Sequence, residues 1–294
     1  MKFTIFTPTY NRRELLKKLY ESLKKQVYKD FEWIIVDDGS TDGTEGAVKE
    51  FISENILDIK YFYKKNEGKQ RAYNLGVEKA EGELFICLDS DDEYVPEGLE
   101  TIERYWRKYE SDKKIAGMGY LSIYSDGQTV GTEFPLAEMT ETQFNIYNKY
   151  EVKGDKGLMF RTEIIKKYPF PVFEGEKFIT EAVVYNRICE RYKMVYINEK
   201  IEIKEYQKEG LTSGYDKLLL NNPKGQVLYH NEINRHKMSF GKKILNNAVY
   251  YKFCRKAGYK FSEIWEKSEA KIFLLMALPI GIYMYGKIKG KGER

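Results

Sequence analysis

Hydrophobic and polar positions alternate regularly along the first 110 residues of the chain. Four short apolar segments predict strands at residues 3–7, 32–36, 59–63 and 84–88. Apolar residues at helical spacing and favourable start signals predict helices at residues 13–26, 41–52, 69–80 and 96–109. Strands that alternate with helices in this way predict an α/β fold, with a mostly parallel sheet flanked by helices on both faces.

Polar clusters follow three of these strands, at Thr7–Asn11, Asp37–Ser40 and Asp89–Asp92. Ligands of parallel sheets bind at the carboxyl ends of the strands, so we expect the three clusters to meet at one edge and form a ligand site. Further along the chain the pattern is less regular. It predicts strands at 115–124, 129–134 and 195–206, a polar loop at 137–149, a helix at 180–192, and helices from about residue 221 onward.

The composition excludes several classes of protein. With 42% hydrophobic and 32% charged residues and a mean hydropathy of −0.59, the 294-residue chain can bury a core but is not a polytopic membrane protein. Three widely spaced cysteines form neither a disulfide framework nor a zinc motif, which favours a reducing compartment, and the first residues predict no export signal. Only two histidines occur, so catalysis is expected to depend on carboxylates, Lys, Arg, Tyr or a hard metal ion.

Basic residues are concentrated at the C-terminal end. Residues 242–294 carry a net charge of +8 and the rest of the chain −4, which favours a polyanionic partner. The fourteen residues 272–285 are uncharged and shorter than the ~20 that span a bilayer. The flanking lysines favour a helix that lies on an anionic membrane surface, and the alternative is a buried helix with a kink at Pro279. No recognisable fold supports nucleic acid as the partner.

The polar clusters contain residue types that suit a nucleotide and a metal ion. The oxygen ligands of residues 89–92 (Asp-Ser-Asp-Asp) suit Mg²⁺ or Mn²⁺ bridged to a diphosphate, although a solvated acidic turn has the same composition. The acidic pair that opens Asp37–Ser40 could accept hydrogen bonds from a base or ribose, or form an ordinary Asp-Gly turn. Tyr10 could stack on a base, and Asn11 is expected to cap the first helix unless it too contacts the ligand.

Four motifs together resemble glycosyltransferase family 2. They are Thr7–Asn11, Val36–Thr44, Asn66–Lys69 and Asp89–Asp92. The resemblance implies a GT-A fold, a nucleotide-sugar donor and a divalent metal, Mn²⁺ or Mg²⁺. It also implies that residues 1–110 bind the donor and that residues 111–220 bind the acceptor. The charge and the apolar pattern predict that residues 221–294 form a helical, basic and membrane-associating extension.

The resemblance implies roles for individual residues at matching positions. Asp38 would accept from the pyrimidine N3–H, Asp91 would ligate the metal, and Lys69 or Arg71 would contact the diphosphate. The complete nucleotide-binding set comprises Thr7, Pro8, Thr9, Tyr10, Asp38, Lys69, Arg71, Asp89 and Ser90. The chain departs from the commonest family pattern at Tyr73, where that pattern has an arginine directly before the asparagine.

Inverting members of this family use a carboxylate as the general base, which must lie within hydrogen-bond reach of the acceptor hydroxyl. Residues 175–182 resemble the family's base segment, and Glu181 is the expected base, a Glu where Asp is more usual. Glu176 is the rival, and Glu181 could instead be a helix N-terminal acid favoured by the macrodipole. Glu205–Ser213 resembles a loop that closes over the diphosphate, and a polar surface loop is equally compatible with it.

The leading hypothesis is an inverting, metal-dependent glycosyltransferase. It would move a sugar from a nucleotide donor, UDP in the first place, to a lipid-linked bacterial surface glycan at the cytoplasmic face of the membrane. One alternative, a nucleotidyltransferase, lacks the Gly-rich phosphate loop that it would need after the first strand. A second alternative is a degenerate GT-A scaffold that binds nucleotide sugars or polyanions without catalysis, although Asp91 and the candidate base are both present.

Overall fold

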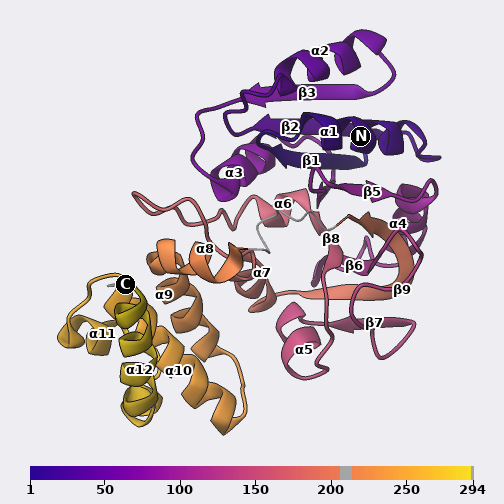
Figure 1. Cartoon of the computed structure of the whole chain (residues 1–294). Coiled ribbons are helices and arrows are strands. Elements are labelled where there is room, and N and C mark those ends of the chain that lie inside the picture. Colours follow the sequence, from indigo (N-terminus) through magenta and orange to yellow (C-terminus); the bar gives the residue numbers. More distant parts are fainter. Residues whose placement is uncertain (206–213, 293–294) are drawn as a thin grey trace. The chain divides into compact units, whose positions relative to one another are not determined.

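The computed structural model of the chain describes residues 1–205 and 214–292, with side chains described as far as Ile288. The chain forms two compact units (Figure 1). The first contains Met1–Phe170 and the stretch that begins at Arg187, and the second contains Pro171–Asn186 and the C-terminal helices. The predicted division into residues 1–110, 111–220 and 221–294 is defined by what each region binds. The two compact units do not test it, and it stays a prediction.

Strands and helices alternate along the first half of the first unit, as the hydrophobic pattern predicts. The elements are β1 (Phe3–Thr9), α1 (Arg13–Lys24), β2 (Phe31–Asp37), α2 (Thr44–Glu54), β3 (Asp58–Tyr63), α3 (Lys69–Lys79), β4 (Leu84–Cys87), β5 (Asp92–Tyr94) and α4 (Gly98–Trp106). β1 pairs in parallel with β2 and β4, and β2 pairs in parallel with β3. The four strands and four helices predicted for this half are confirmed, whereas β5 is a short polar strand that the sequence does not indicate.

The second half of this unit completes the sheet. Its elements are β6 (Ile115–Ile123), β7 (Glu138–Glu141), α5 (Gln143–Asn148), β8 (Lys156–Arg161), α6 (Thr162–Ile165), the end of α7 (Ala182–Cys189) and β9 (Lys193–Lys204). The strand order is β3-β2-β1-β4-β8-β6-β9-β5, with β7 paired to β9. β8 runs antiparallel to both β4 and β6. The sheet is therefore parallel from β3 to β4 and mixed beyond β4.

Two predictions for the middle of the chain are wrong. Residues 129–134 form an isolated bridge between Thr129 and Ile123 rather than a strand, because Gly131 has a left-handed φ of +74° that ends the extended run. The loop predicted at residues 137–149 contains β7 and α5. β7 is polar because it pairs only with β9 at the margin of the sheet, and Thr142 caps α5 by accepting the Asn145 N–H.

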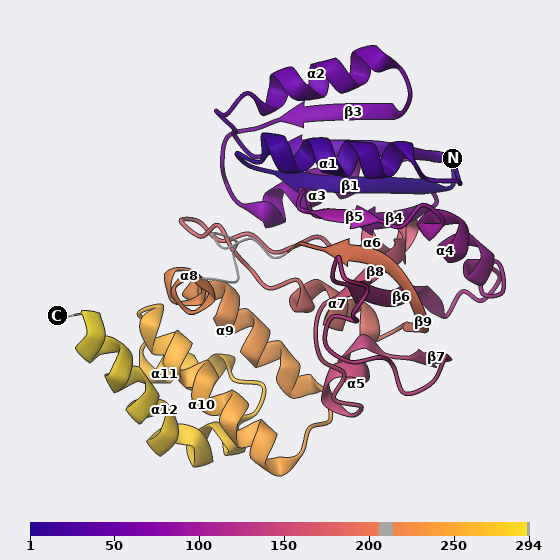
Figure 2. The same cartoon turned by 45° about the vertical axis from the view of Figure 1, so that its right-hand side comes forward.

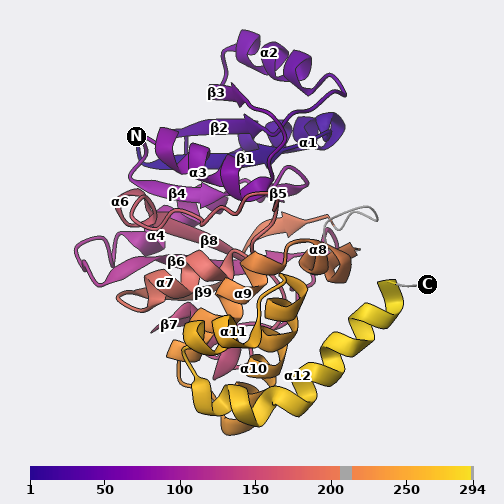
Figure 3. The ribbon, with the colours of Figure 1, turned by 90° about the vertical axis from the view of Figure 1, so that its left-hand side faces the viewer.

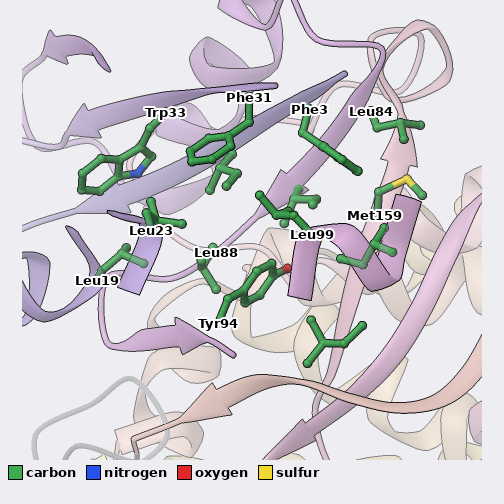
Figure 4. Packing of buried hydrophobic residues seen from close by; sticks show 14 of the residues in the cluster. Phe3, Leu19, Leu23, Phe31, Trp33, Leu84, Leu88, Tyr94, Leu99 and Met159 are labelled. Carbon is green, nitrogen blue, oxygen red and sulfur yellow. The ribbon is translucent and has the colours of Figure 1, made fainter. Parts of the chain in front are cut away.

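The largest core of the first unit joins the sheet to α1, α2 and α4, and Figure 4 shows part of it. Trp33 of β2 is fully buried and stacks on Tyr20 of α1 and Phe51 of α2, with ring centroids 6.1 and 6.3 Å away. Its indole N–H donates to the Thr7 hydroxyl at 3.0 Å, so the one polar atom of this large side chain is satisfied inside the core. This packing fixes β1 and β2 against each other, and with them the residues at their carboxyl ends.

The C-terminal part of the second unit is helical, as predicted (Figures 2 and 3). Its elements are α8 (Tyr215–Asn221), α9 (Pro223–Glu232), the 3₁₀ helix η2 (Ile233–Arg235), α10 (Phe240–Lys256), α11 (Phe261–Lys267) and α12 (Lys271–Gly292). Pro223 occupies the first turn of α9, where its missing N–H costs no hydrogen bond. A small core contains Val227, Tyr250, Phe253, Cys254, Ile264 and Leu274.

Helix α12 has two apolar faces, of which one is buried. Ala270, just before the helix, and Leu274, Ala277 and Gly281 are buried. At Gly281 an added Cβ would lie 2.9 Å from the Tyr251 ring of α10, so glycine permits this close approach. Large apolar side chains on the other face are 41–73% exposed, among them Ile272, Leu275, Met276, Ile280, Ile282 and Tyr283.

The length of α12 changes one argument made from the sequence. The uncharged segment has fourteen residues, but the helix continues past it, and Lys271–Ile288 is an 18-residue window with a mean hydropathy of 1.4. By length and composition alone this window could cross a membrane. One face of α12 packs on α10 and the other is exposed, so the helix is not buried on both sides, and its attachment to a membrane surface stays a prediction.

Candidate active site

The carboxyl ends of three parallel strands bring the predicted polar clusters to one edge of the sheet. Thr9 at the end of β1 lies opposite Asp37 at the end of β2, and the next N–H after Asp37 donates to the Thr9 carbonyl at 2.8 Å. Arg12, which directly follows the first cluster, and Asp91 of the third form an ion pair at 2.6 Å. The convergence that the sequence predicts is therefore confirmed by direct contacts between the clusters.

The first cluster has side chains that face inward and side chains that stay accessible. Thr7 is fully buried and bonded to Trp33, so contact with a nucleotide at this position would fall to its backbone. Thr9 is 3% exposed, and its hydroxyl has no hydrogen-bond partner among the described residues. Buried polar atoms normally have a partner, so this hydroxyl fits a contact that a ligand completes. Tyr10 is 49% exposed and is accessible to a base.

Asn11 does not cap α1, in contrast to the expectation from sequence. Its backbone is left-handed, with a φ of 50°, and its side-chain oxygen accepts the Thr41 N–H at 2.8 Å. Asparagine tolerates this conformation, which turns the amide away from the helix and toward the loop after β2. Asp42 instead accepts the Arg13 N–H at 2.9 Å and so binds the first turn of α1. These two bonds fasten Asn11 and the start of α1 to the loop after β2.

Asp37 forms the turn that follows β2. It is fully buried, and its carboxylate accepts the Ser40 N–H at 2.7 Å and the Tyr61 hydroxyl at 2.8 Å. Burial and the adjacent carboxylate raise the pKa of Tyr61, so the hydroxyl stays a donor. The interpretation as a structural Asp-Gly turn therefore applies to the first residue of the acidic pair.

Asp38 organises the loop that leads into α3. Its carboxylate accepts from the Lys64 ammonium at 2.7 Å and from the backbone N–H groups of Glu67 and Gly68 at 3.0 and 2.8 Å. A carboxylate offers about four lone-pair positions, so three bonds leave room for a further donor. Sequence reasoning missed Lys64, although the residue directly follows β3 and the strand-end argument would have found it.

The acidic segment after β4 is matched by basic side chains from elsewhere in the chain. Asp89 pairs with Lys69 of α3 at 2.7 Å, and Asp91 pairs with Arg12. Burial alone would raise the pKa of Asp89, but the ammonium of Lys69, with Lys204 and Arg12 nearby, holds it below its ordinary value. Sequence reasoning named Lys69 and missed Arg12, which stands next to the predicted motif.

A buried ion cluster lies directly after Asp91. The Lys204 ammonium, at the end of β9, lies 2.5 Å from Asp92 and 2.6 Å from Glu202. Burial, together with the neighbouring carboxylates, raises the pKa of Asp92 even though Lys204 opposes this shift. Of the predicted loop that follows, Glu205 pairs with Lys18 at 2.8 Å, and residues 206–213 lie outside the described residues.

The first turn of α3 holds the two candidates for diphosphate contact. Lys69 begins the helix and reaches Asp89, and the Arg71 guanidinium lies 3.4 Å from the Glu67 carbonyl. Tyr73, at the position where the family pattern has arginine, is 2% exposed and packs edge-on against Phe170, with ring centroids 4.8 Å apart. It is a core residue, so phosphate contact in this turn can come only from its neighbours.

The acidic residues of the site fit a divalent cation whose remaining ligands come from substrate phosphates and water. Among residues 1–205 and 214–292, no cluster of three or more His, Cys, Asp or Glu side chains is arranged to hold a metal ion. Mg²⁺ and Mn²⁺ are commonly held by one or two carboxylates together with substrate phosphates and water. Asp91, with Asp89 two residues away, has the hard oxygen donors that such a site needs.

The two candidate bases differ in their surroundings, and both belong to the second unit. Glu176 is 6% exposed, and its two oxygens accept the Lys224 and Gly225 N–H groups at 2.7 and 3.0 Å. It therefore caps the N-terminus of α9. Glu181 directly precedes α7, and the Tyr185 hydroxyl lies 3.4 Å from its carboxylate. The capping role of Glu176 gives that carboxylate a structural function and counts against it as the base.

An α/β sheet with polar strand ends and an acidic segment is typical of nucleotide-binding proteins, and comparison with known families identifies the family of this chain. The family model "Glycosyl transferase family 2" matches residues 4–169, so the chain belongs to this family. The glycosyltransferase GlyA of Streptococcus pneumoniae is 27% identical over 228 residues, which are 72% of this chain and 31% of that protein.

Two further similarities extend the comparison. The GalNAc(5)-diNAcBac-PP-undecaprenol beta-1,3-glucosyltransferase of Campylobacter jejuni is 30% identical over 180 residues, or 60% of this chain and 50% of that protein. The crystal structure of residues 1–349 of TarS from Staphylococcus aureus, in complex with UDP-GlcNAc, superposes with a TM-score of 0.67 at 20% identity, covering 97% of this chain and 89% of that one. The predicted GT-A fold is confirmed. The chain spans half or less of the length of these two curated relatives.

Proposed function

We propose that this chain is an inverting, metal-dependent glycosyltransferase that moves one sugar from a nucleotide donor to a growing bacterial surface glycan. The observation that carries the proposal is the edge of the sheet that holds the exposed Tyr10 ring, the Asp38 carboxylate and the Thr9 hydroxyl, which has no partner among the described residues. The ion pair of Arg12 with Asp91 joins this edge to the acidic segment. These groups match what a base and a ribose require. TarS, which has this fold, is solved with UDP-GlcNAc, and this supports UDP as the nucleotide of the donor.

The donor is held by residues at the ends of β1, β2 and β4 and by the start of α3. The backbone of Thr7 and Pro8, with Thr9 and Tyr10, contacts the base and ribose, while Asp38 accepts the pyrimidine N–H. Lys69 or Arg71 contacts the diphosphate, and Asp89 and Ser90 lie at the ribose. A divalent cation, Mn²⁺ or Mg²⁺, held by Asp91 would take up negative charge on the departing diphosphate.

Glu181 acts as the general base in this proposal. Its carboxylate accepts the proton of the acceptor hydroxyl as that oxygen attacks the anomeric carbon from the face opposite the leaving group. A single displacement of this kind inverts the anomeric centre. The assignment is supported by the position of Glu181 just before α7 and by the engagement of Glu176 with the backbone of α9.

The first test is slow hydrolysis of the donor by the full chain across UDP-, GDP- and dTDP-sugars, with Mn²⁺ or with a chelator. We expect one donor to be hydrolysed in a cation-dependent manner, with a loss of at least ~100-fold in Asp91→Asn. Asp58→Asn is the matched control, because Asp58 is exposed at the amino end of β3. Calorimetry of UDP with Mn²⁺ separates the alternatives. Binding without turnover would favour a degenerate binding scaffold, and failure to bind any nucleotide would refute the proposal.

The acceptor in this proposal is a lipid-linked glycan, and α12 attaches the enzyme to the cytoplasmic face of an anionic membrane. The Campylobacter relative, as its name states, acts on an undecaprenol-linked glycan, which supports a lipid-linked acceptor. The exposed apolar face of α12 supports a surface attachment, since soluble proteins rarely expose such a stripe. Lys271 and Lys287 flank it and suit anionic lipid. Because the other face packs on α10, we favour a helix that lies on the membrane over one that spans it.

Flotation with lipid vesicles tests this attachment. We expect binding to vesicles that contain phosphatidylglycerol, weaker binding to pure phosphatidylcholine, and loss of binding in Leu275→Glu, which changes a side chain that is 48% exposed. Ile56→Glu, at a residue of the first unit that is 52% exposed, is the matched control and should bind normally. Release by high salt or carbonate would indicate a surface helix, and resistance to both would show that the helix spans the bilayer. Normal binding by Leu275→Glu would refute the role of α12.

A further inference from the structure

Asp91, the residue that the proposed function makes the metal ligand, already has a cationic partner in this structure. Arg12 Nη1 lies 2.6 Å from Asp91 Oδ2, and the two side chains are only 26% and 18% exposed. The neighbouring carboxylates have other partners, since Asp89 pairs with Lys69 and Asp92 with Lys204. Each acidic residue of the segment is thus matched by its own basic side chain, and Arg12 is the one matched to Asp91.

The position of Arg12 makes this pair well defined. Arg12 follows the left-handed Asn11 and directly precedes α1 (Arg13–Lys24). Its neighbours are held by hydrogen bonds to the loop after β2: the Asn11 side-chain oxygen accepts the Thr41 N–H, and the Arg13 N–H donates to Asp42. The backbone on both sides of Arg12 is therefore fixed, and a short ion pair in a partly buried setting is stronger than an exposed one because water screens it less.

A guanidinium and a divalent cation require the same thing from Asp91, namely the lone pairs of a carboxylate oxygen. A cation cannot take Oδ2 while Arg12 holds it at hydrogen-bond distance, because two positive charges at that separation repel strongly in a partly buried site. Metal binding through Oδ2 therefore requires the departure of Arg12, and binding through Oδ1 would place the cation close to the guanidinium, so in both cases the charge of Arg12 opposes the cation.

We propose that Arg12 is a built-in counter-ion that occupies Asp91 when the cation is absent and competes with the cation for it. This inference rests on the proposed function only in taking Asp91 as the metal ligand. It predicts that the affinity for a divalent cation in the absence of donor is limited by Arg12. Removal of the guanidinium should therefore tighten metal binding, the opposite of what loss of a ligand would do.

The test is a titration of the full chain with Mn²⁺ and no nucleotide, followed by the electron paramagnetic resonance signal of free Mn²⁺. Arg12→Gln should bind Mn²⁺ at least ~10-fold more tightly than the natural chain. Arg13→Gln is the matched control, because it removes the same charge from the adjacent residue. The Arg13 side chain lies 3.5 Å from Glu14, so the affinity of this variant for Mn²⁺ should stay unchanged. Adding Asp91→Asn to Arg12→Gln should abolish the gain.

Each remaining outcome would overturn the inference. Equal affinity in Arg12→Gln and the natural chain, no detectable binding by Arg12→Gln, or an equal gain in Arg13→Gln would show that Arg12 does not compete for Asp91. If Arg12→Gln does not fold, Arg12→Met keeps the apolar stem and gives the same test. The two proposals can fail independently. If the natural chain showed no metal-dependent donor hydrolysis, the proposed function would fail, but the Mn²⁺ titration could still be interpreted. If the natural chain hydrolysed the donor but Arg12→Gln did not bind Mn²⁺ more tightly, only the inference about Arg12 would be refuted.

Discussion

Glu176 and Glu181 lie five residues apart and should respond to the same substitution in opposite ways. In Glu176→Gln, one amide oxygen can still accept a backbone N–H of α9, but the amide NH₂ then faces the second N–H as a donor. The carboxylate makes two short bonds, at 2.7 and 3.0 Å, from a side chain that is 6% exposed. Hydrogen bonds to charged groups contribute about 1.5–3 kcal/mol each, so we expect a loss of ~2–3 kcal/mol of unfolding free energy.

The assay combines thermal unfolding with hydrogen exchange of the α9 amides. A loss of this size corresponds to ~8 °C or more for a unit of about 100 residues, and the Lys224 and Gly225 amides should exchange faster. Donor hydrolysis by the folded protein should be retained. Glu181→Gln should keep the melting temperature within ~2 °C but lower sugar transfer to an acceptor by ~100-fold or more, since it removes the base.

The pair of variants makes the reasoning refutable. If Glu176→Gln lost transfer activity without any loss of stability, Glu176 would be the base and the capping argument would be wrong. If Glu181→Gln transferred sugar at the natural rate, Glu181 would not be the base. The assignment from the resemblance of residues 175–182 to a base segment, and from the position of Glu181 before α7, would then be wrong.

Three further predictions follow from buried groups. Burial beside Phe253 lowers the pKa of His230 to about 4 from its usual 6.5, so the unfolded chain binds the proton more readily than the folded chain does. The melting temperature should therefore fall as the pH drops from about 6.5 to 4. In a pH series of calorimetric melts, His230→Gln should lose this dependence. Lys204→Met leaves Asp92 buried without its cation and should cost ~3–5 kcal/mol in urea unfolding, whereas a loss below ~1 kcal/mol would contradict the ion cluster. Thr9→Val should keep stability and weaken UDP binding in calorimetry, while Thr7→Val should lower stability instead, because only the Thr7 hydroxyl is bonded within the core.

The first half of the fold and the location of the site could be predicted from sequence because both depend on local patterns. Buried parallel strands are continuous apolar runs, and the parallel arrangement itself places the residues after β1, β2 and β4 at one edge. The mixed half was harder to predict. β7 is a polar strand whose formation depends on pairing with β9, and Gly131 ends a strand-like run through its backbone conformation.

Ion pairs within the site could not be derived from the sequence. Arg12 and Asp91 are 79 positions apart, and Lys204 and Asp92 are 112 positions apart. Helix and strand periodicity relates only residues that are close in sequence, so it cannot predict these pairs. The strand-end argument indicates which edge a residue occupies but not which charge faces which. The same limit applies to Asn11, whose residue type suits a helix cap, while its left-handed backbone directs the amide elsewhere.

The charge balance of the site connects the proposed function with the role of Arg12. Asp89, Asp91 and Asp92 are each paired with one basic side chain, so carboxylates already balance the positive charge of Lys69, Arg12 and Lys204. A cation that takes Asp91 changes this, because it adds two positive charges and releases the Arg12 guanidinium at the same time. Under the proposal for Arg12, positive charge beyond that of Lys69 or Arg71 thus becomes available to a diphosphate at the edge of the sheet when the cation is bound, and metal and donor favour each other's binding without any rearrangement of the sheet.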